Sequence, residues 1–573
     1  MKKLIPILML LLAFNCQKSI KEEKPPLVTS NISCTTPAIT DKEWYSNDNV
    51  APLFENMGDL HFPISTDNEL VQKYFDQGLT LAYGFNHAEA ARSFYYASKL
   101  DPDCAMAYWG FAYVLGPNYN AGMEPDNYER AYQAIQKALN VPESKTTPKE
   151  RAMIEALSKR YVKEPVEDRT PLDIEYSNAM KALFSKYPDD ADIGTLYTES
   201  LMNLHPWDLF DKEGIAREWT HEIIKNLESI LVEYPNHCGA NHFYIHAVES
   251  SNTPERGLNS AKLFDAGLVP NSGHLVHMPS HIYIRTGDYH KGTLSNIQAV
   301  KVDSTYITAC HAQGAYPLGY YPHNIHFLAA TAALEGNSKW ALYSSDEIAK
   351  SSNTMLMKEP GWGTIQHYYT IPFYVYVKFG RWNDILKMEN KVPDLDYPKA
   401  IHHYARGMAY LGKNDLGKAK TELQELSKID SRESLKEVTI WDINTAYDLT
   451  QIAEKVLKAE ILAKESNFNE SIKLLKEAIV IEDGLNYNEP PDWFFSVRHN
   501  LGAVQLKAGL NQDAVDTYLE DLKRLPKNGW ALNGLAVAYS NLNDQQNLMI
   551  TQEKFKRAWA TADVELNGSI VKY

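Results

Sequence analysis

Residues 78–102 read GLTLAYGFNHAEAARSFYYASKLDP. Apolar side chains recur in this stretch at three- and four-residue spacing, which predicts a pair of helices. Small residues at Gly78 and Ala90 allow the two helices to approach closely, Phe94 fills the seam, and Pro102 ends the second helix. A pair of this kind cannot bury its apolar face alone, so further pairs must stack on it.

The spacing of Gly78, Ala90, Phe94, Ala97 and Pro102 resembles the tetratricopeptide repeat. From about residue 68 the chain reads as helical almost throughout, and parts of the same pattern recur downstream. They are Gly336 with Ala341, Gly380, Gly407 with Ala419, Gly502 with Ala514, and Gly534 after Trp530. The resemblance implies an all-α fold, a tetratricopeptide-type α-solenoid over residues 56–573, wound as a right-handed superhelix of roughly ten helix pairs.

Four insertions break the period of the predicted repeats. They lie near residues 117–124, 163–170, 206–214 and 303–319. Because loops carry function more often than the scaffold that holds them, we expect these segments to mark where the chain is more than a plain solenoid.

The composition limits the kinds of partner that the protein is expected to bind. The chain has 573 residues, 44% of them hydrophobic, and 73 acidic against 57 basic residues, which gives a net charge of −16. The hydrophobic content supports a large buried core. The negative charge would repel phosphate backbones, so we expect no nucleic-acid partner.

The N-terminus predicts export. Lys2 and Lys3 precede an apolar run over residues 4–14 that is too short to span a bilayer. The run stops at Cys16, which resembles a bacterial lipoprotein signal and implies a signal peptide over residues 1–16, lipidation of Cys16, and a location in the bacterial cell envelope. Residues 17–55 are polar and Pro-rich, as in a flexible tether. An ordinary secretory signal, cut elsewhere, is the alternative.

The other cysteines show no close or metal-type spacing, so the sequence assigns no disulfide among them: Cys34, Cys104, Cys238 and Cys310.

Histidines gather in the middle of the chain, around residues 236–380. Of 18 histidines, seven lie in three short motifs within residues 242–326: HFYIH, HLVHMPSH and HNIH. The spacings of three and four residues place each set on one face of a helix.

The histidines also follow the repeat. Gly287, Gly336 and Gly380 are predicted to mark the turns between the first and second helix of three units. His274 and His323 lie thirteen residues before such a turn, and other histidines lie ten or six residues before one. In the tetratricopeptide family these offsets belong to the face that lines the concave groove, so the resemblance implies that the histidines meet there.

Neutral imidazoles that converge from adjacent helices are typical ligands of zinc, copper or iron, and the sequence does not choose among these metals. The predicted ligands are His242, His246, His277 and His281, with His274, His323, His326 and Glu249 completing one site or forming a second. Two other interpretations stay open at this point. The histidines could grip a polar ligand in the groove, or they could pack between stacked helices.

The sequence contains no phosphate-binding loop, no Gly-x-Ser-x-Gly, no His-Glu-x-x-His and no Cys-x-x-Cys. Residues 85–90, 101–110, 242–249 and 274–281 are similar to a group of exported bacterial tetratricopeptide-repeat proteins. Two functions follow as hypotheses: a metal-binding solenoid with oxidoreductase or hydrolase chemistry, or a non-catalytic envelope module that uses its groove for a peptide or protein partner.

Overall fold

The structure is a computed structural model and describes residues 42–46, 49–310 and 316–571, without the side chains of 42–43, 306–310 and 316–317. The predicted signal peptide, Cys16 and Cys34 lie outside the described residues, as do residues 17–41 and 47–48 of the predicted tether. Cys104 and Cys238 are buried free thiols. Residues 49–62 lie against the first helices, where Tyr74 Oη donates to the carbonyl oxygen of Ala51.

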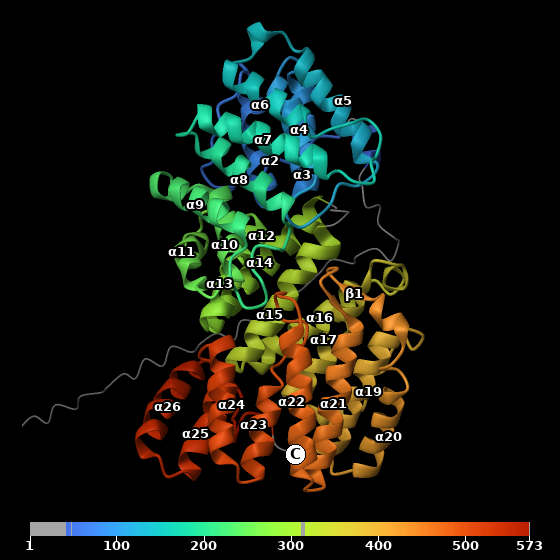
Figure 1. The fold of residues 1–573 in the computed structure, drawn as a ribbon. Coiled ribbons are helices and arrows are strands. Elements are labelled where there is room, and N and C mark those ends of the chain that lie inside the picture. Colours follow the sequence, from blue (N-terminus) through green and yellow to red (C-terminus); the bar gives the residue numbers. More distant parts are fainter. Residues whose placement is uncertain (1–41, 47–48, 311–315, 572–573) are drawn as a thin grey trace, which may run out of the picture.

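The described chain is helical nearly throughout (Figure 1). The first half holds α1 (Lys42–Ser46), α2 (Glu69–Tyr83), α3 (His87–Leu100), α4 (Ala105–Leu115), α5 (Asn127–Asn140), η1 (Glu143–Lys145), α6 (Pro148–Ser158), α7 (Thr170–Lys186), α8 (Ala191–Leu204), α9 (Glu218–Glu233), α10 (Cys238–Glu249), η2 (Pro254–Gly257), α11 (Leu258–Asp265), α12 (Gly273–His277), α13 (Pro279–Thr286) and α14 (Tyr289–Cys310).

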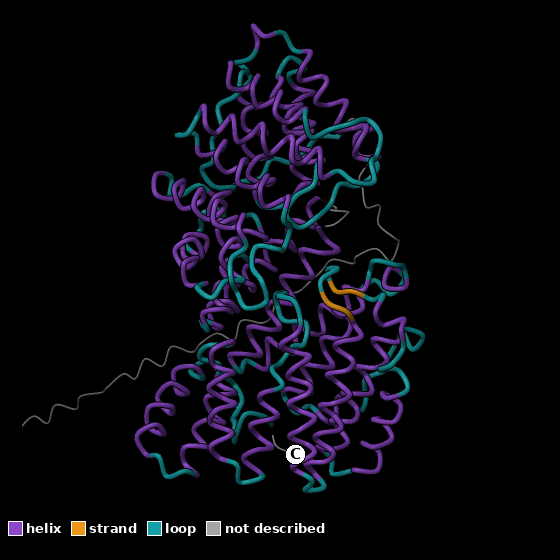
Figure 2. The backbone as a smooth tube through the Cα atoms, in the orientation of Figure 1, coloured by secondary structure: helices purple, strands orange, loops and turns teal. Residues whose placement is uncertain are grey.

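The second half holds η3 (Tyr316–Tyr320), α15 (Tyr321–Glu335), α16 (Ser338–Ser351), η4 (Leu356–Lys358), α17 (Gly363–Lys378), α18 (Trp382–Ile385), α19 (Asp396–Gly412), α20 (Leu416–Ser427), η5 (Glu433–Lys436), α21 (Ala446–Lys464), α22 (Phe468–Gly484), α23 (Arg498–Lys507), α24 (Asn511–Arg524), α25 (Gly529–Asn541) and α26 (Gln545–Ala558). A short antiparallel hairpin, β1 (Thr439–Ile440) and β2 (Asn444–Thr445), interrupts them, and Figure 2 shows it beside the junction of the two halves.

The packing of the quoted stretch explains the repeat. A Cβ on Gly78 would lie 2.8 Å from the ring of Phe94, and one on Gly110 would lie 2.3 Å from the same ring. Phe94 of α3 is fully buried and therefore fills the seam between α2 and α4. Asn86 begins α3 by accepting a hydrogen bond from the backbone N–H of Glu89.

The same arrangement recurs near the other end of the chain. The ring of Tyr518 on α24 lies against Gly502 of α23 and Gly534 of α25, where added Cβ atoms would come within 2.3 and 2.4 Å of it. An aromatic ring between two glycines thus joins three successive helices in both places. The predicted all-α fold of stacked tetratricopeptide-type helix pairs is confirmed.

The stack folds back on itself around two large hydrophobic cores, one built from residues 51–283 and one mainly from residues 284–504. The C-terminal helices return to the middle of the chain: Trp530 Nε1 donates to the carbonyl oxygen of Ala333, and Tyr289 Oη donates to that of Pro526. The loop between α22 and α23, residues 485–497, reaches α10, where Tyr487 Oη donates to Oε2 of Glu249. The histidine-bearing helices are therefore covered from several sides.

Within the described ranges, none of the helices is both long enough and apolar enough to cross a membrane.

Candidate metal centre

Three separate helical segments carry the predicted ligands. α10 supplies His242, His246 and Glu249; α12 and α13 supply His274, His277 and His281; α15 supplies His323 and His326. The sequence predicts that these histidines line an open groove. In the structure all of them are at most 3% exposed except His323, which is half-buried. The groove is closed there because the chain returns over it.

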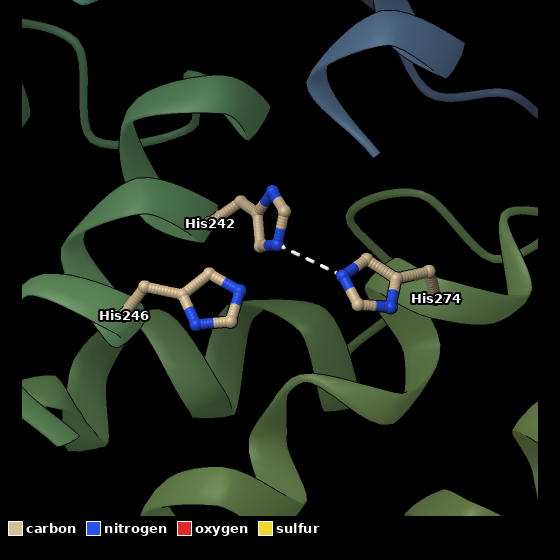
Figure 3. A group of neighbouring side chains, drawn as sticks. All are labelled: His242, His246 and His274. Atoms are coloured by element: carbon tan, nitrogen blue, oxygen red, sulfur yellow. Dashed lines mark hydrogen bonds between the residues drawn. The ribbon is translucent and has the colours of Figure 1, made fainter. Parts of the chain in front are cut away.

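His242, His246 and His274 form one group, here called the first triad (Figure 3). Ring nitrogens from the three residues all lie within 4.8 Å of one another. His242 Nδ1 lies 2.5 Å from the carbonyl oxygen of Tyr83, so this nitrogen carries the hydrogen and donates it. Nε2 of His242 then presents its lone pair and lies 3.1 Å from Nε2 of His274.

His277, His281 and His323 form a second group of the same kind, the second triad. Nδ1 of His277 lies 2.7 Å from Oδ1 of Asn296, and the amide nitrogen of Asn296 donates to the carbonyl oxygen of Gly292. Oδ1 is therefore an acceptor, and His277 Nδ1 carries the hydrogen. Nε2 of His277 lies 2.9 Å from Nε2 of His281.

Glu249 connects the two triads. Its Oε1 lies 2.7 Å from Nδ1 of His246, in the first triad, and its Oε2 lies 2.5 Å from Nδ1 of His281, in the second. Both imidazoles thus donate to one carboxylate and turn their Nε2 atoms away from it. Nε2 of His246 has no hydrogen-bond partner among the described residues.

Burial keeps most of these imidazoles neutral. Burial and the neighbouring histidines lower the pKa of His242, His274, His277 and His323 well below the ordinary value. Burial also lowers the pKa of His246, against the opposing effect of Glu249. A neutral imidazole whose Nδ1–H is anchored offers Nε2 as a ligand at neutral pH.

His281 differs because two carboxylates face it. Burial lowers its pKa, but Glu249 and Glu489 outweigh this effect and raise the pKa to about 9. Oε2 of Glu489 lies 3.2 Å from Nδ1 of His281. Glu489 comes from the loop after α22, far away in sequence, and no periodic signal marks it.

His326 lies apart from the two triads. Its ring packs against His367 of α17, with centroids 5.4 Å apart, and stacks on Phe494 at 5.3 Å. His367 Nδ1 lies 2.8 Å from Tyr397 Oη. The structure therefore brings seven of the eight predicted residues together and places His326 in a second, smaller histidine pair.

The nitrogen positions fit transition-metal ligation. With metal–nitrogen bonds of about 2.0–2.1 Å, two ligands on a tetrahedral ion lie about 3.3 Å apart. The Nε2 pairs at 3.1 and 2.9 Å are close to this distance. Three imidazoles per group leave a fourth position for water or substrate, as in catalytic rather than structural sites.

A cavity of about 340 Å³, here called the histidine pocket, opens onto both triads. Its histidine side is formed by His246, His274, His281 and His323, and its aromatic side chains are Trp207, Tyr320, Trp362 and Trp441. Three of the four predicted insertions contribute to it, through Asn120, Trp207 and Gly319. The insertions that break the repeat thus indicated part of the pocket from the sequence, whereas no sequence pattern marks Trp441 or Glu489.

The sequence matches no known protein family by its family profile, and no curated protein matches it either. Several solved structures align with most of the chain at low identity. Human IFIT1, in a dimer with m7Gppp-AAAA, is 13% identical over 89% of this chain and 92% of its own, with a TM-score of 0.31. Yeast Tom70 is 12% identical over 85% and 92%, with a TM-score of 0.31.

The TPR domain of P58(IPK) is 12% identical over 86% of this chain and 99% of its own, with a TM-score of 0.20. All three TM-scores are below 0.5, so this likeness carries no information about function. The chain folds as an all-α stack of tetratricopeptide-type helix pairs, and these helices enclose two histidine triads.

Proposed function

We propose that this protein binds transition metal ions, one in each histidine triad. The observation that carries the proposal is the paired arrangement of anchored imidazoles: Nδ1 of His242, His246, His277 and His281 each faces an oxygen acceptor. Packing histidines would need no such uniform orientation, whereas metal ligands typically have an oxygen acceptor behind the ring.

The donor set bears on which metal is bound. Each triad offers three nitrogens, and Glu249 lies behind two rings with both oxygens engaged, so we place it outside the first ligand shell. A set of imidazoles alone suits copper or zinc better than metals that prefer oxygen. When bound, such an ion would polarise a water or an oxygen ligand at its open position.

Elemental analysis tests the proposal. The full chain is expressed with export to the envelope of a bacterial host and purified without chelators. One sample is analysed as purified, and a second is first reconstituted with copper or zinc. We expect close to two ions per chain. The His277→Ala, His281→Ala double variant should lose one ion, and His242→Ala, His274→Ala should lose the other. The matched control is His61→Ala, His221→Ala, which removes two exposed histidines and should retain both ions.

Two results would contradict the proposal. One is an unmutated protein that holds no transition metal near stoichiometry even after reconstitution. The other is equal metal content in the triad variants and the control.

The predicted location is also a proposal. An envelope protein tethered by a lipid at Cys16 would place the histidine pocket outside the cytoplasm, where a partner protein could meet the outer faces of the helices. Cys16→Ser tests this: the variant should lose incorporation of labelled fatty acid and leave the membrane fraction. Unchanged labelling would exclude Cys16 as the anchor.

A further inference from the structure

Two of the four aromatic residues that line the histidine pocket, Trp207 and Trp441, have an unusual backbone conformation, as does Phe85 beside His242. Three aromatic residues in the described ranges have a positive φ: Phe85 at 55°, Trp207 at 58° and Trp441 at 52°. The other non-glycine residues with positive φ are Asn, Asp, Ser or Lys. A bulky side chain in this conformation costs on the order of 1–3 kcal/mol and persists only where its surroundings enforce it.

All three of these aromatic residues lie at the histidines. The Phe85 ring is 4.6 Å from that of His242 by centroids, Trp207 is 5.9 Å from His246, and Trp441 is 6.4 Å from His323. Trp207 and Trp441 both line the pocket, yet Trp441 remains 41% exposed. A glycine at either position would adopt the positive φ without strain, so a partly exposed tryptophan there lowers the stability of the fold. Its presence therefore points to a role in binding.

The charges of the pocket restrict the ligand further. Asp442 and Glu489 line it, and none of its described lining residues is Lys or Arg. A carboxylate or phosphate would meet Asp442 and Glu489, whereas His281, the one described lining residue with a raised imidazole pKa, is already paired with Glu249 and Glu489. The amide of Asn120 and the lining histidines provide polar contacts beside the aromatic side chains. A neutral, flat ring with one oxygen donor satisfies both kinds of surface.

We infer that the histidine pocket binds a small free phenol, whose ring contacts Trp207 and Trp441 and whose hydroxyl oxygen reaches the metal position. The inference rests on the proposed metal function. The pocket volume of about 340 Å³ is near the lower end for ligand sites, which are roughly 300–1,000 Å³, and suits one substituted ring.

A binding experiment tests it. Metal content is first measured in every sample, and 4-methylphenol is then titrated into the metal-loaded full chain while tryptophan fluorescence is recorded. Cyclohexanol carries the same oxygen without the aromatic ring, benzoate carries the ring with a negative charge, and a Gly-Tyr-Gly peptide with blocked ends presents a phenol on a polypeptide. We expect 4-methylphenol to bind at least tenfold more tightly than each of the three.

Variants locate the site. Trp441→Leu should weaken 4-methylphenol binding at least tenfold with unchanged metal content. Trp441→Gly should do the same while accepting the positive φ without strain, which separates lost binding from misfolding. The matched control is Trp340→Leu on α16, away from the pocket lining, which should bind as the unmutated chain does.

The outcomes are distinguishable. Metal-loaded protein that binds cyclohexanol or benzoate as tightly as 4-methylphenol, or that is insensitive to Trp441, overturns this inference and leaves the metal proposal standing. Tighter binding of the peptide overturns the assignment to a small free phenol. Protein that holds no metal overturns both proposals.

Discussion

Oε2 of Glu249 lies 2.5 Å from Nδ1 of His281, and the opposite oxygen of the same carboxylate holds His246. Burial alone would raise the pKa of Glu249, but the imidazoles of His281 and His246 hold it well below the ordinary value. The carboxylate is therefore ionised and orients one ligand in each triad.

Glu249→Gln should weaken metal binding in both triads together. An amide accepts from one imidazole but presents N–H groups to the other, so one ring loses its anchor. The other ring keeps only a neutral hydrogen bond in place of one to a carboxylate, so its anchor is weakened too. We expect a 10- to 100-fold loss of affinity, the usual effect of removing such a partner, measured by competition with a chromogenic chelator. Glu422→Gln is the matched control, because Glu422 holds His403 at 2.7 Å outside the site. Equal affinities in the two variants would argue against the role of Glu249.

Tyr518 should contribute strongly to the stability of the C-terminal helices. Its fully buried ring separates Gly502 from Gly534, so Tyr518→Ala leaves a cavity among three helices. Truncations of this kind typically cost about 3–5 kcal/mol. Denaturation in urea should show this loss, whereas the neighbouring Leu519→Ala, at a side chain 43% exposed, should change stability by about 0.5 kcal/mol or less. Similar effects for both variants would contradict the described packing.

Lys378 should make stability depend on pH. Burial lowers its pKa to about 7, although Asp521 acts in the opposite direction, and Nζ lies 2.8 Å from Nδ1 of His499. Between about pH 7 and the unfolded pKa of about 10.4, the unfolded chain binds one more proton than the folded chain at this site. This contribution to stability therefore rises with pH in that window, by up to about 1.4 kcal/mol per pH unit.

Lys378→Met isolates this contribution. Urea denaturation at each pH gives the unfolding free energies of the unmutated chain and of Lys378→Met. From pH 7 to pH 10, the free energy of the unmutated chain should rise relative to that of the variant. A difference that stays constant across the window would show that Lys378 titrates normally.

The helices and the histidine faces were predictable because both depend on local spacing. Gly78, Ala90 and Phe94 mark a repeat within one short stretch, and His242 and His246 share a helix face at four-residue spacing. His326 shows where this reasoning stops. It lies only three residues after His323, yet three residues turn a helix by about 300°, which leaves the two side chains about 60° apart. That angle is enough for His326 to face His367 instead of the triads.

The remaining parts of the site depend on distant segments. Glu489 and Trp441 reach the histidines from a loop and a hairpin tip in the second half of the chain. Their positions follow from the return of the C-terminal helices, which rests on contacts such as that of Trp530 with Ala333. A repeat pattern specifies how neighbouring helices pack but not how far the stack curls.

Anomalous diffraction from crystals of the metal-reconstituted full chain, recorded at the absorption edge of the added copper or zinc, tests the central claim most directly. Two peaks are expected, one about 2.0–2.1 Å from Nε2 of His242 and of His246 and from a ring nitrogen of His274, the other at the same distance from Nε2 of His277 and of His281 and from a ring nitrogen of His323. Ordered imidazoles with no anomalous peak among them, or peaks only at surface histidines such as His61, would contradict it.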